Sequence, residues 1–209
     1  MRLAPIGMKK HLPIKDIDEK MRMTKIVELK TERLLLRQWK KRDFPIFSTM
    51  NADPLVMEYY PDVLTETESD AMAHKLESLL AKRSWGFWAV ELIKEKQFIG
   101  FVGLHKPTYE LPVTPCVEIG WRLGKEYWGN GYATEGAKAA LKFAFEELNL
   151  NEVYSFTSVL NEKSRSVMAR LNMQNTKTNF EHPIIPKGHR LREHVLYEIT
   201  KKQWENTTV

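Results

Sequence analysis

The chain has 209 residues, 43% of them apolar, and a formal net charge of +5 at pH 7. This is enough apolar material for one domain with a buried core, and the single cysteine, Cys116, excludes an intrachain disulfide. No apolar run approaches the ~18 residues of a membrane span and no signal peptide opens the chain, so we expect a soluble, cytoplasmic protein. The positive charge is spread along the chain without a basic helix or an aromatic stripe, which argues against a nucleic-acid partner.

The N-terminal part of the sequence mixes charged residues, prolines and scattered apolar residues without a sustained period. We therefore predict an extension over residues 1–30, poorly ordered or loosely docked, followed by a domain over residues 31–205. The apolar run of residues 32–39 predicts the first strand, and residues 41–50 predict a short helix.

The next elements have local start signals. Pro54 after Asp53 indicates a short helix over residues 53–58. The capping box of Thr65 and Glu68 indicates a longer helix that ends near residue 83. Two apolar runs, residues 87–93 and 97–105, then predict a pair of strands joined as a hairpin.

A strand over residues 117–123 is the best defined of the chain. Its side chains alternate between two faces, Val117, Ile119, Trp121 and Leu123 on one and Glu118, Gly120 and Arg122 on the other. One face is therefore expected to be core, and the other to present a carboxylate beside a position that has no side chain. Apolar residues recur at helical spacing from Ala133 to Leu148 and predict a long amphipathic helix that packs closely through its alanines.

A glycine loop, residues 128–134, connects this strand to the helix. Gly129 and Gly131 allow the backbone to turn its N–H groups toward one point, and the first turn of the helix adds unpaired N–H groups and the positive end of its dipole. Such a junction binds phosphate groups. Asn130-Gly131 is also a common hairpin turn, which is the competing interpretation. The P-loop and dinucleotide-binding patterns are absent.

The C-terminal part of the sequence completes the sheet. Residues 152–159 predict a strand, Asn161 is expected to cap a helix that ends near residue 172, and residues 180–192 predict a longer loop before a last strand over residues 194–200. The pattern predicts one mixed α/β domain with a central sheet of six to seven strands.

The run Tyr-Trp-Gly-Asn-Gly-Tyr-Ala-Thr-Glu, residues 127–135, resembles the signature loop of the GNAT acetyltransferase superfamily, in the form found in its RimJ/RimL-like branch. The usual signature is [Q/R]-x-x-G-x-[G/A]; Trp128 stands at the Gln/Arg position, and Gly131 and Ala133 stand at the small positions. Downstream, Asn161-x-x-Ser164 followed by an apolar helix is similar to a second segment of the family. The resemblance spans residues 31–204 and implies a mostly antiparallel sheet flanked by helices.

Acetyl transfer to an amine needs a neutral amine, a stabilised oxyanion and a protonated leaving thiolate. Glu118 is the candidate base, acting directly or through a water; the competing interpretation is that it forms an ion pair with a nearby Lys or Arg. A backbone N–H of residues 119–121 would hold the oxyanion. The resemblance gives Ser164 as the proton donor and Asn161 as a partner of the pantetheine arm, with Tyr132 or Tyr127 as further candidate donors.

The resemblance also implies acetyl-CoA as co-substrate and a primary amine as acceptor, either the N-terminal α-amine of a protein or a small molecule. The residues expected to bind the cofactor are Ile119, Gly120, Trp121, Trp128, Gly129, Asn130, Gly131, Tyr132, Ala133, Thr134, Asn161 and Ser164. The histidines show no metal-ligand spacing, so no metal site is expected. A homodimer is a further implication, and the alternative function is a non-catalytic acyl-CoA-binding module. The acceptor would be selected by the loops 59–65, 106–115 and 180–192, with Tyr59, Tyr60, Pro61 and His105 as candidate contacts.

Overall fold

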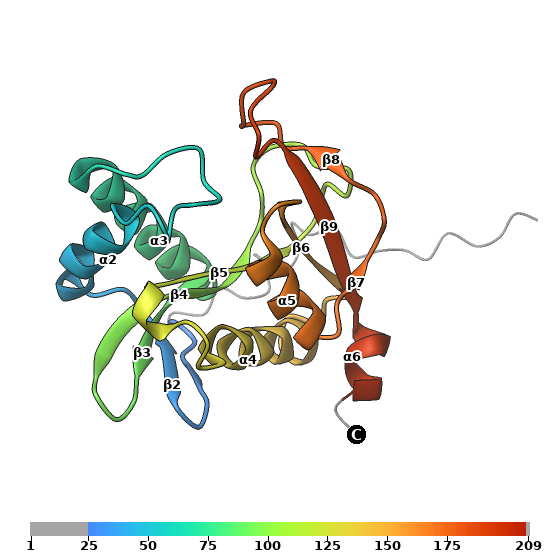
Figure 1. The fold of residues 1–209 in the computed structure, drawn as a ribbon. Helices are drawn as coiled ribbons and strands as arrows, with labels where there is room; N and C mark the ends of the chain where they lie inside the picture. Colours follow the sequence, from blue (N-terminus) through green and yellow to red (C-terminus); the bar gives the residue numbers. More distant parts are fainter. Residues whose placement is uncertain (1–24, 208–209) are drawn as a thin grey trace, which may run out of the picture.

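A nine-stranded mixed sheet is the centre of the computed structural model, which describes residues 25–207 (Figure 1). The strands are β1 (Leu29–Lys30), β2 (Leu34–Arg37), β3 (Phe87–Leu92), β4 (Gln97–His105), β5 (Glu118–Leu123), β6 (Glu152–Ser158), β7 (Gln174–Asn175), β8 (Phe180–Glu181) and β9 (Glu193–Thr200). Their order is β1-β2-β3-β4-β5-β6-β9-β7, with β8 also paired to β9. Six of them have four residues or more, and the three two-residue strands account for the excess over the predicted six to seven.

All neighbouring strands pair antiparallel except β5 and β6. This parallel pair has a single register contact, between Glu118 and Tyr154. The Tyr154 N–H donates to the Val117 carbonyl at 3.0 Å, and no further ladder pair joins the two strands within residues 25–207. The sheet is therefore split at its middle, with one edge of β5 facing the split. The mixed α/β class and the mostly antiparallel sheet are confirmed.

Helices cover both faces of the sheet. The elements are η1 (Lys41–Asp43), α2 (Phe44–Asn51), α3 (Glu66–Arg83), η2 (Lys125–Tyr127), α4 (Tyr132–Glu146), α5 (Glu162–Arg170) and α6 (Lys201–Thr207). Helix α4 packs against β2, β4 and β5 through alanines that are fully buried, as its sequence predicts, while α2 and α3 pack against β3 and β4 (Figure 1). Helix α3 begins at the predicted capping box, where Thr65 N–H donates to Glu68 at 2.9 Å.

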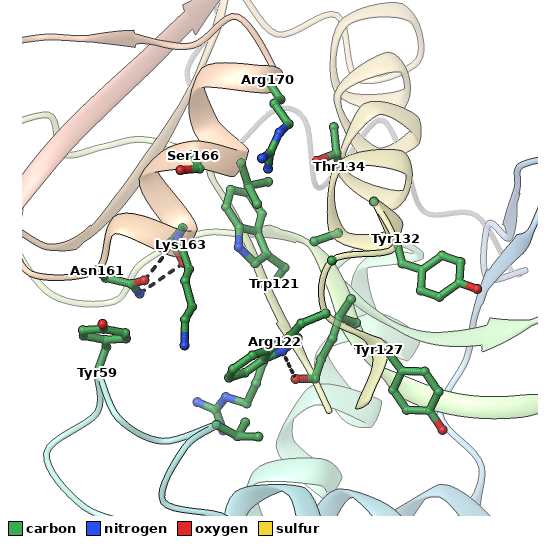
Figure 2. Close-up of a pocket in the computed structure, with 18 of the residues that line it drawn as sticks. Tyr59, Trp121, Arg122, Tyr127, Tyr132, Thr134, Asn161, Lys163, Ser166 and Arg170 are labelled. Atoms are coloured by element: carbon green, nitrogen blue, oxygen red, sulfur yellow. Dashed lines mark hydrogen bonds between the residues drawn. The ribbon is translucent and has the colours of Figure 1, made fainter. Parts of the chain in front are cut away.

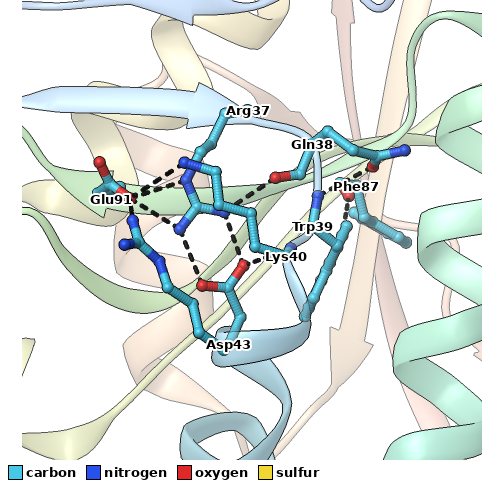
Figure 3. Close-up of polar contacts among 8 residues, drawn as sticks. Arg37, Gln38, Trp39, Lys40, Asp43, Phe87 and Glu91 are labelled. Atoms are coloured by element: carbon cyan, nitrogen blue, oxygen red, sulfur yellow. Dashed lines mark hydrogen bonds and ion pairs between the residues drawn. The ribbon is translucent and has the colours of Figure 1, made fainter.

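A buried ion-pair cluster connects β2, β3 and η1 (Figure 3). Arg37 is 1% exposed and donates from both Nη atoms to Asp43, at 2.6 and 2.9 Å, and from Nε to Glu91 at 2.9 Å. Its Nη1 also donates to the Gln38 carbonyl at 2.8 Å. Burying a guanidinium is costly, and here two carboxylates and a carbonyl compensate the charge and satisfy its donors.

The structure differs from the sequence predictions in two segments. Residues 53–58 form turns instead of a helix. The Asp53 carboxylate accepts from the Leu55 N–H at 2.9 Å, as a helix cap does, and the Met57 N–H donates to the Asp53 carbonyl at 3.0 Å, but no helix continues from this turn. Asp53 also pairs with Lys125 at 2.7 Å. The predicted loop 180–192 begins with the short strand β8. In the predicted extension, Leu29–Lys30 pairs with β2, whereas residues 1–24 lie outside the described residues. Cys116 is free and buried.

Candidate active site

The loop between β5 and α4 has the backbone that its glycines allow. Gly129 and Gly131 have φ of 77° and 81°, a region that other residues adopt only with strain, and Gly131 is the N-cap of α4. The Asn130 side chain donates to the carbonyls of Tyr127 and Trp128 at 3.2 and 3.1 Å and so closes the loop on itself. Because a helix follows directly, Asn130-Gly131 is not a hairpin turn.

A cavity of about 610 Å³ lies between this loop, α5 and the segment that precedes α3 (Figure 2). It brings together nine of the twelve residues expected to bind a cofactor: Trp121, Trp128, Gly129, Gly131, Tyr132, Ala133, Thr134, Asn161 and Ser164. Tyr59 and Tyr60, candidate substrate contacts, also line it.

The other three expected residues lie elsewhere. The Ile119 side chain is 2% exposed in the core, and its carbonyl accepts from Ser155 Oγ at 2.9 Å. Gly120 lies under the ring of Phe87, at 3.2 Å from the position that a Cβ would take. The Asn130 side chain donates its hydrogen bonds to carbonyls of the loop itself. Ile119 and Gly120 can therefore contribute only backbone groups to this site.

Asn161 and Ser164 form one hydrogen-bonded unit at the start of α5. Asn161 Oδ1 accepts from the Ser164 N–H at 3.1 Å, which is the predicted helix cap. Its Nδ2 donates to Ser164 Oγ at 3.1 Å and to Thr157 Oγ1 at 2.9 Å. The dashed lines at Asn161 in Figure 2 mark its hydrogen bonds with Ser164. The amide thus fixes the Ser164 hydroxyl at the cavity wall.

The tyrosine rings at the loop turn away from the space between α4 and α5. In Figure 2, Tyr127 and Tyr132 point to the far side of the loop, and the Arg33 guanidinium lies 4.6 Å from the centre of the Tyr132 ring. Of the candidate proton donors, Ser164 is therefore the one whose hydroxyl is held at the wall shared by α5 and the loop.

Two cations of α5 were missed by the sequence reasoning. Lys163 and Arg170 line the cavity together with Ser166 and Val167. Figure 2 shows Arg170 directed toward the space opposite Thr134. The spacing of these four residues, i, i+3, i+4 and i+7, places them on one helical face, and this was the available signal.

Glu118 lies on the α2/α3 side of the sheet, directly across from His105 on β4. Burial raises the pKa of its carboxyl to about 8. No ion pair compensates it within residues 25–207, so the expectation of a Lys or Arg partner finds no support there. Its neighbours are also without charge near neutral pH, because burial lowers the pKa of His105 to about 4 and raises those of Tyr109 and Cys116.

Two further expectations concern absences. Within residues 25–207, no cluster of three or more His, Cys, Asp or Glu side chains is arranged to hold a metal ion. In the same part of the chain, none of the helices has the length and apolar character needed to cross a membrane.

Comparisons with known proteins identify the class of protein that this architecture belongs to. A sequence model described as the acetyltransferase (GNAT) domain matches residues 33–174, and the chain therefore belongs to the GNAT family of acetyltransferases. The chain is thus an acyltransferase by family.

Individual relatives agree with this assignment. The chain is 30% identical to an uncharacterized N-acetyltransferase, YnaD, of Bacillus subtilis, over 85% of this chain and 99% of that protein. It is 34% identical to the FsC-acetyl coenzyme A-N(2)-transacetylase of Aspergillus fumigatus, over 74% of this chain and 68% of that protein. The crystal structure of a GNAT-family acetyltransferase from Bacillus anthracis superimposes with a TM-score of 0.70 at 30% identity, covering 84% of this chain and 99% of that chain.

Proposed function

We propose that this protein transfers an acetyl group from acetyl-CoA to a primary amine, with acetyl-CoA bound in the cavity between α4 and α5. The observation that carries the proposal is the composition of the cavity wall. A glycine loop, a helix N-terminus and the cations Lys163 and Arg170 meet there.

The wall fits the phosphate groups of coenzyme A. Backbone N–H groups of the loop and the first turn of α4 donate to phosphate oxygens, and the dipole of α4 favours negative charge at this end. Around Gly129 nothing lies within 4 Å of the position that a Cβ would take, so the backbone is open to a ligand. Arg170 adds a positive charge on the opposite wall, where Lys163 also lies, with its Nζ 3.7 Å from Glu58 Oε2 and 4.4 Å from the centre of the Trp128 ring.

The thioester would lie at the split between β5 and β6. The carbonyls of Val117 and Ile119 both point toward β6, because they accept from Tyr154 N–H and Ser155 Oγ. Residues of the same parity in a strand point to the same edge, so the N–H groups of Ile119 and Trp121 face β6 as well. The parallel pair of Glu118 with Tyr154 engages the Ile119 N–H with the Tyr154 carbonyl, whereas Trp121 has no ladder partner on β6 among the described residues. The Trp121 N–H is therefore the group suited to hold the oxyanion of the tetrahedral intermediate.

The proton transfers are assigned to two side chains. Glu118, directly or through a water, takes a proton from the amine nitrogen, which then attacks the thioester carbon. When the C–S bond breaks, Ser164 Oγ donates a proton to the departing thiolate, and Asn161 Nδ2 orients that hydroxyl. Tyr132 is the alternative donor named by the resemblance, and it would have to turn from Arg33 toward the cavity to act.

The finer assignments rest on the sequence. The loop of residues 127–135 supports the RimJ/RimL-like branch, in which the acceptor is a protein N-terminal α-amine or a small-molecule amine. A cytoplasmic location and a homodimer are parts of the same proposal.

The first test is calorimetric titration of the full chain with acetyl-CoA. Gly129→Glu places a carboxylate at the proposed phosphate site. Gly188→Glu is its matched control, since Gly188 has φ of 83°, equally open surroundings and no part in the cavity wall. We expect micromolar binding that is lost only in Gly129→Glu, and release of coenzyme A thiol when amines and N-terminal peptides are added. Absence of binding to the unmodified chain, or equal loss in both variants, would refute the assigned cavity.

A further inference from the structure

Arg122, next to last in β5, is buried without a counter-ion. It is 7% exposed, and its Nη1 donates to Asn51 Oδ1 at 2.7 Å. The Tyr60 ring covers its guanidinium, with the ring centre 4.0 Å away. Its Nε is buried and has no hydrogen-bond partner, and no carboxylate of residues 25–207 forms an ion pair with it.

Arg37 shows how the same protein compensates a buried guanidinium (Figure 3). There, Nε and Nη2 both contact Glu91 Oε2, at 2.9 and 2.8 Å, and the two Nη atoms contact Asp43. The Nε and Nη2 edge suits a carboxylate because its two N–H groups point in parallel. In Arg122 this same edge has no partner among the described residues, although leaving a buried charge uncompensated is unfavourable.

Arg122 and Tyr60 are shared by two cavities. Besides the cavity described above, they line a second one of about 630 Å³ beneath the segment that connects α2 and α3. The carboxylates of that second cavity are otherwise engaged: Glu68 accepts from Thr65 and Asp62 accepts from the Val63 N–H at 2.8 Å. A ligand in this region would therefore meet a guanidinium whose charge the described chain does not neutralise.

We propose that Arg122 binds a carboxylate carried by the acceptor amine, so that the acceptors of this enzyme are amines joined to an acidic group by an apolar chain. This inference rests on the proposed acetyl transfer. Glu118 and Arg122 project from the same face of β5, four residues and about 13 Å apart. Between them the Phe87 ring lies over Gly120 and packs 5.0 Å from the buried ring of Phe101, so the surroundings of the connecting chain are apolar.

The phosphates of acetyl-CoA are the other source of negative charge. Lys163, Arg170 and the glycine loop lie on the α4/α5 side of the sheet, where Trp121 also lines the cavity. Arg122 follows Trp121 in the strand and therefore points to the opposite face, toward Asn51 of α2 and Met72 of α3. Arg122 also lines the first cavity, beside Tyr60, but its guanidinium makes its hydrogen bonds to α2 and α3, and this geometry assigns it to the acceptor.

The experiment compares an acid with its uncharged amide. The full chain, saturated with coenzyme A, is titrated calorimetrically with ε-aminohexanoate and with ε-aminohexanamide, and then with the shorter pair based on γ-aminobutyrate. We expect the acid of at least one pair to bind at least tenfold more tightly than its amide. In Arg122→Gln this advantage should fall to less than threefold. Arg42→Gln, which removes the same charge from an exposed side chain, should retain it.

Each contrary result is distinct. Equal binding of acid and amide to the unmodified chain, or an unchanged advantage in Arg122→Gln, overturns the inference. A retained advantage together with weaker acetyl-CoA binding in Arg122→Gln assigns the side chain to the cofactor and overturns it too. If Arg122→Gln does not fold, the comparison of acid and amide binding to the unmodified chain still tests the inference. If the acid binds in a way that depends on Arg122 but no acetyl group is transferred, the proposed function is refuted and the carboxylate-binding site is retained.

Discussion

Replacing Glu118 with Gln tests whether burial holds its carboxyl protonated. The carboxyl has a pKa of about 8 in the folded protein against an ordinary value of 4.5, and desolvation is the cause. Below pH 4.5 both the folded and the unfolded protein carry the proton, so the carboxyl costs nothing. Between pH 4.5 and 8 only the unfolded state ionises, and the free energy of unfolding falls by up to about 1.4 kcal/mol for each pH unit.

The substitution removes this titration, so the variant should gain stability relative to the unmodified chain as the pH rises from 5 to 8. The upper limit of the gain is about 5 kcal/mol at pH 8, which is the displacement of the pKa multiplied by the energy of one unit. Partial exposure of the carboxyl reduces this to a few kcal/mol. Urea unfolding at several pH values measures the difference, with Glu205→Gln, exposed on α6, as control. A difference that does not change with pH would refute the argument.

Activity should change in the opposite direction. If Glu118 is the base, kcat/KM of the unmodified chain rises through an apparent pKa near 8, and Gln lowers it by about 10²-fold or more. Because the acceptor amine also titrates, the profile is measured with two amines of different pKa. If the rise of kcat/KM with pH reflects the ionisation of Glu118, its apparent pKa stays the same when the acceptor amine is changed. A variant that retains kcat/KM within a few-fold would remove Glu118 from the mechanism.

Three further substitutions test the scaffold. Asp43→Asn leaves the buried Arg37 with a weaker partner and should lower the free energy of unfolding by about 3 kcal/mol. Urea unfolding measures this loss, and a loss below about 1 kcal/mol would contradict the stabilising role of the ion-pair cluster. Gly100→Ala should prevent normal folding or displace β5, because its Cβ would lie 2.2 Å from the Arg122 carbonyl oxygen; an unchanged melting temperature would contradict this. Thr65→Ala removes the cap of α3 and should cost about 1 kcal/mol with acetyl-CoA affinity unchanged, and a null effect on unfolding would show that the cap is dispensable.

Local patterns in the sequence determined the main elements. The alternation along β5, the alanine stripe of α4 and the capping box of α3 each involve neighbours within a few residues, and all three are present in the structure. The glycine loop was likewise readable, because positive φ angles at Gly129 and Gly131 are a property of those residues themselves. At Asp53 the sequence was misleading about length: the carboxylate accepts from the Leu55 N–H as a cap does, but the segment ends after a single turn.

Only the tertiary structure decided which charges are compensated. Arg37 and Arg122 both stand in strands, and each has an acidic residue within six positions, Asp43 and Glu126, of which only Asp43 forms an ion pair with its arginine. Glu91, which pairs with Arg37, is 54 residues away, and Asn51, the partner of Arg122, is 71 residues away. The raised pKa of Glu118 has the same origin, since desolvation is produced by whatever packs around a side chain. Periodicity fixes where a side chain points, whereas burial and pairing depend on segments that only folding brings together.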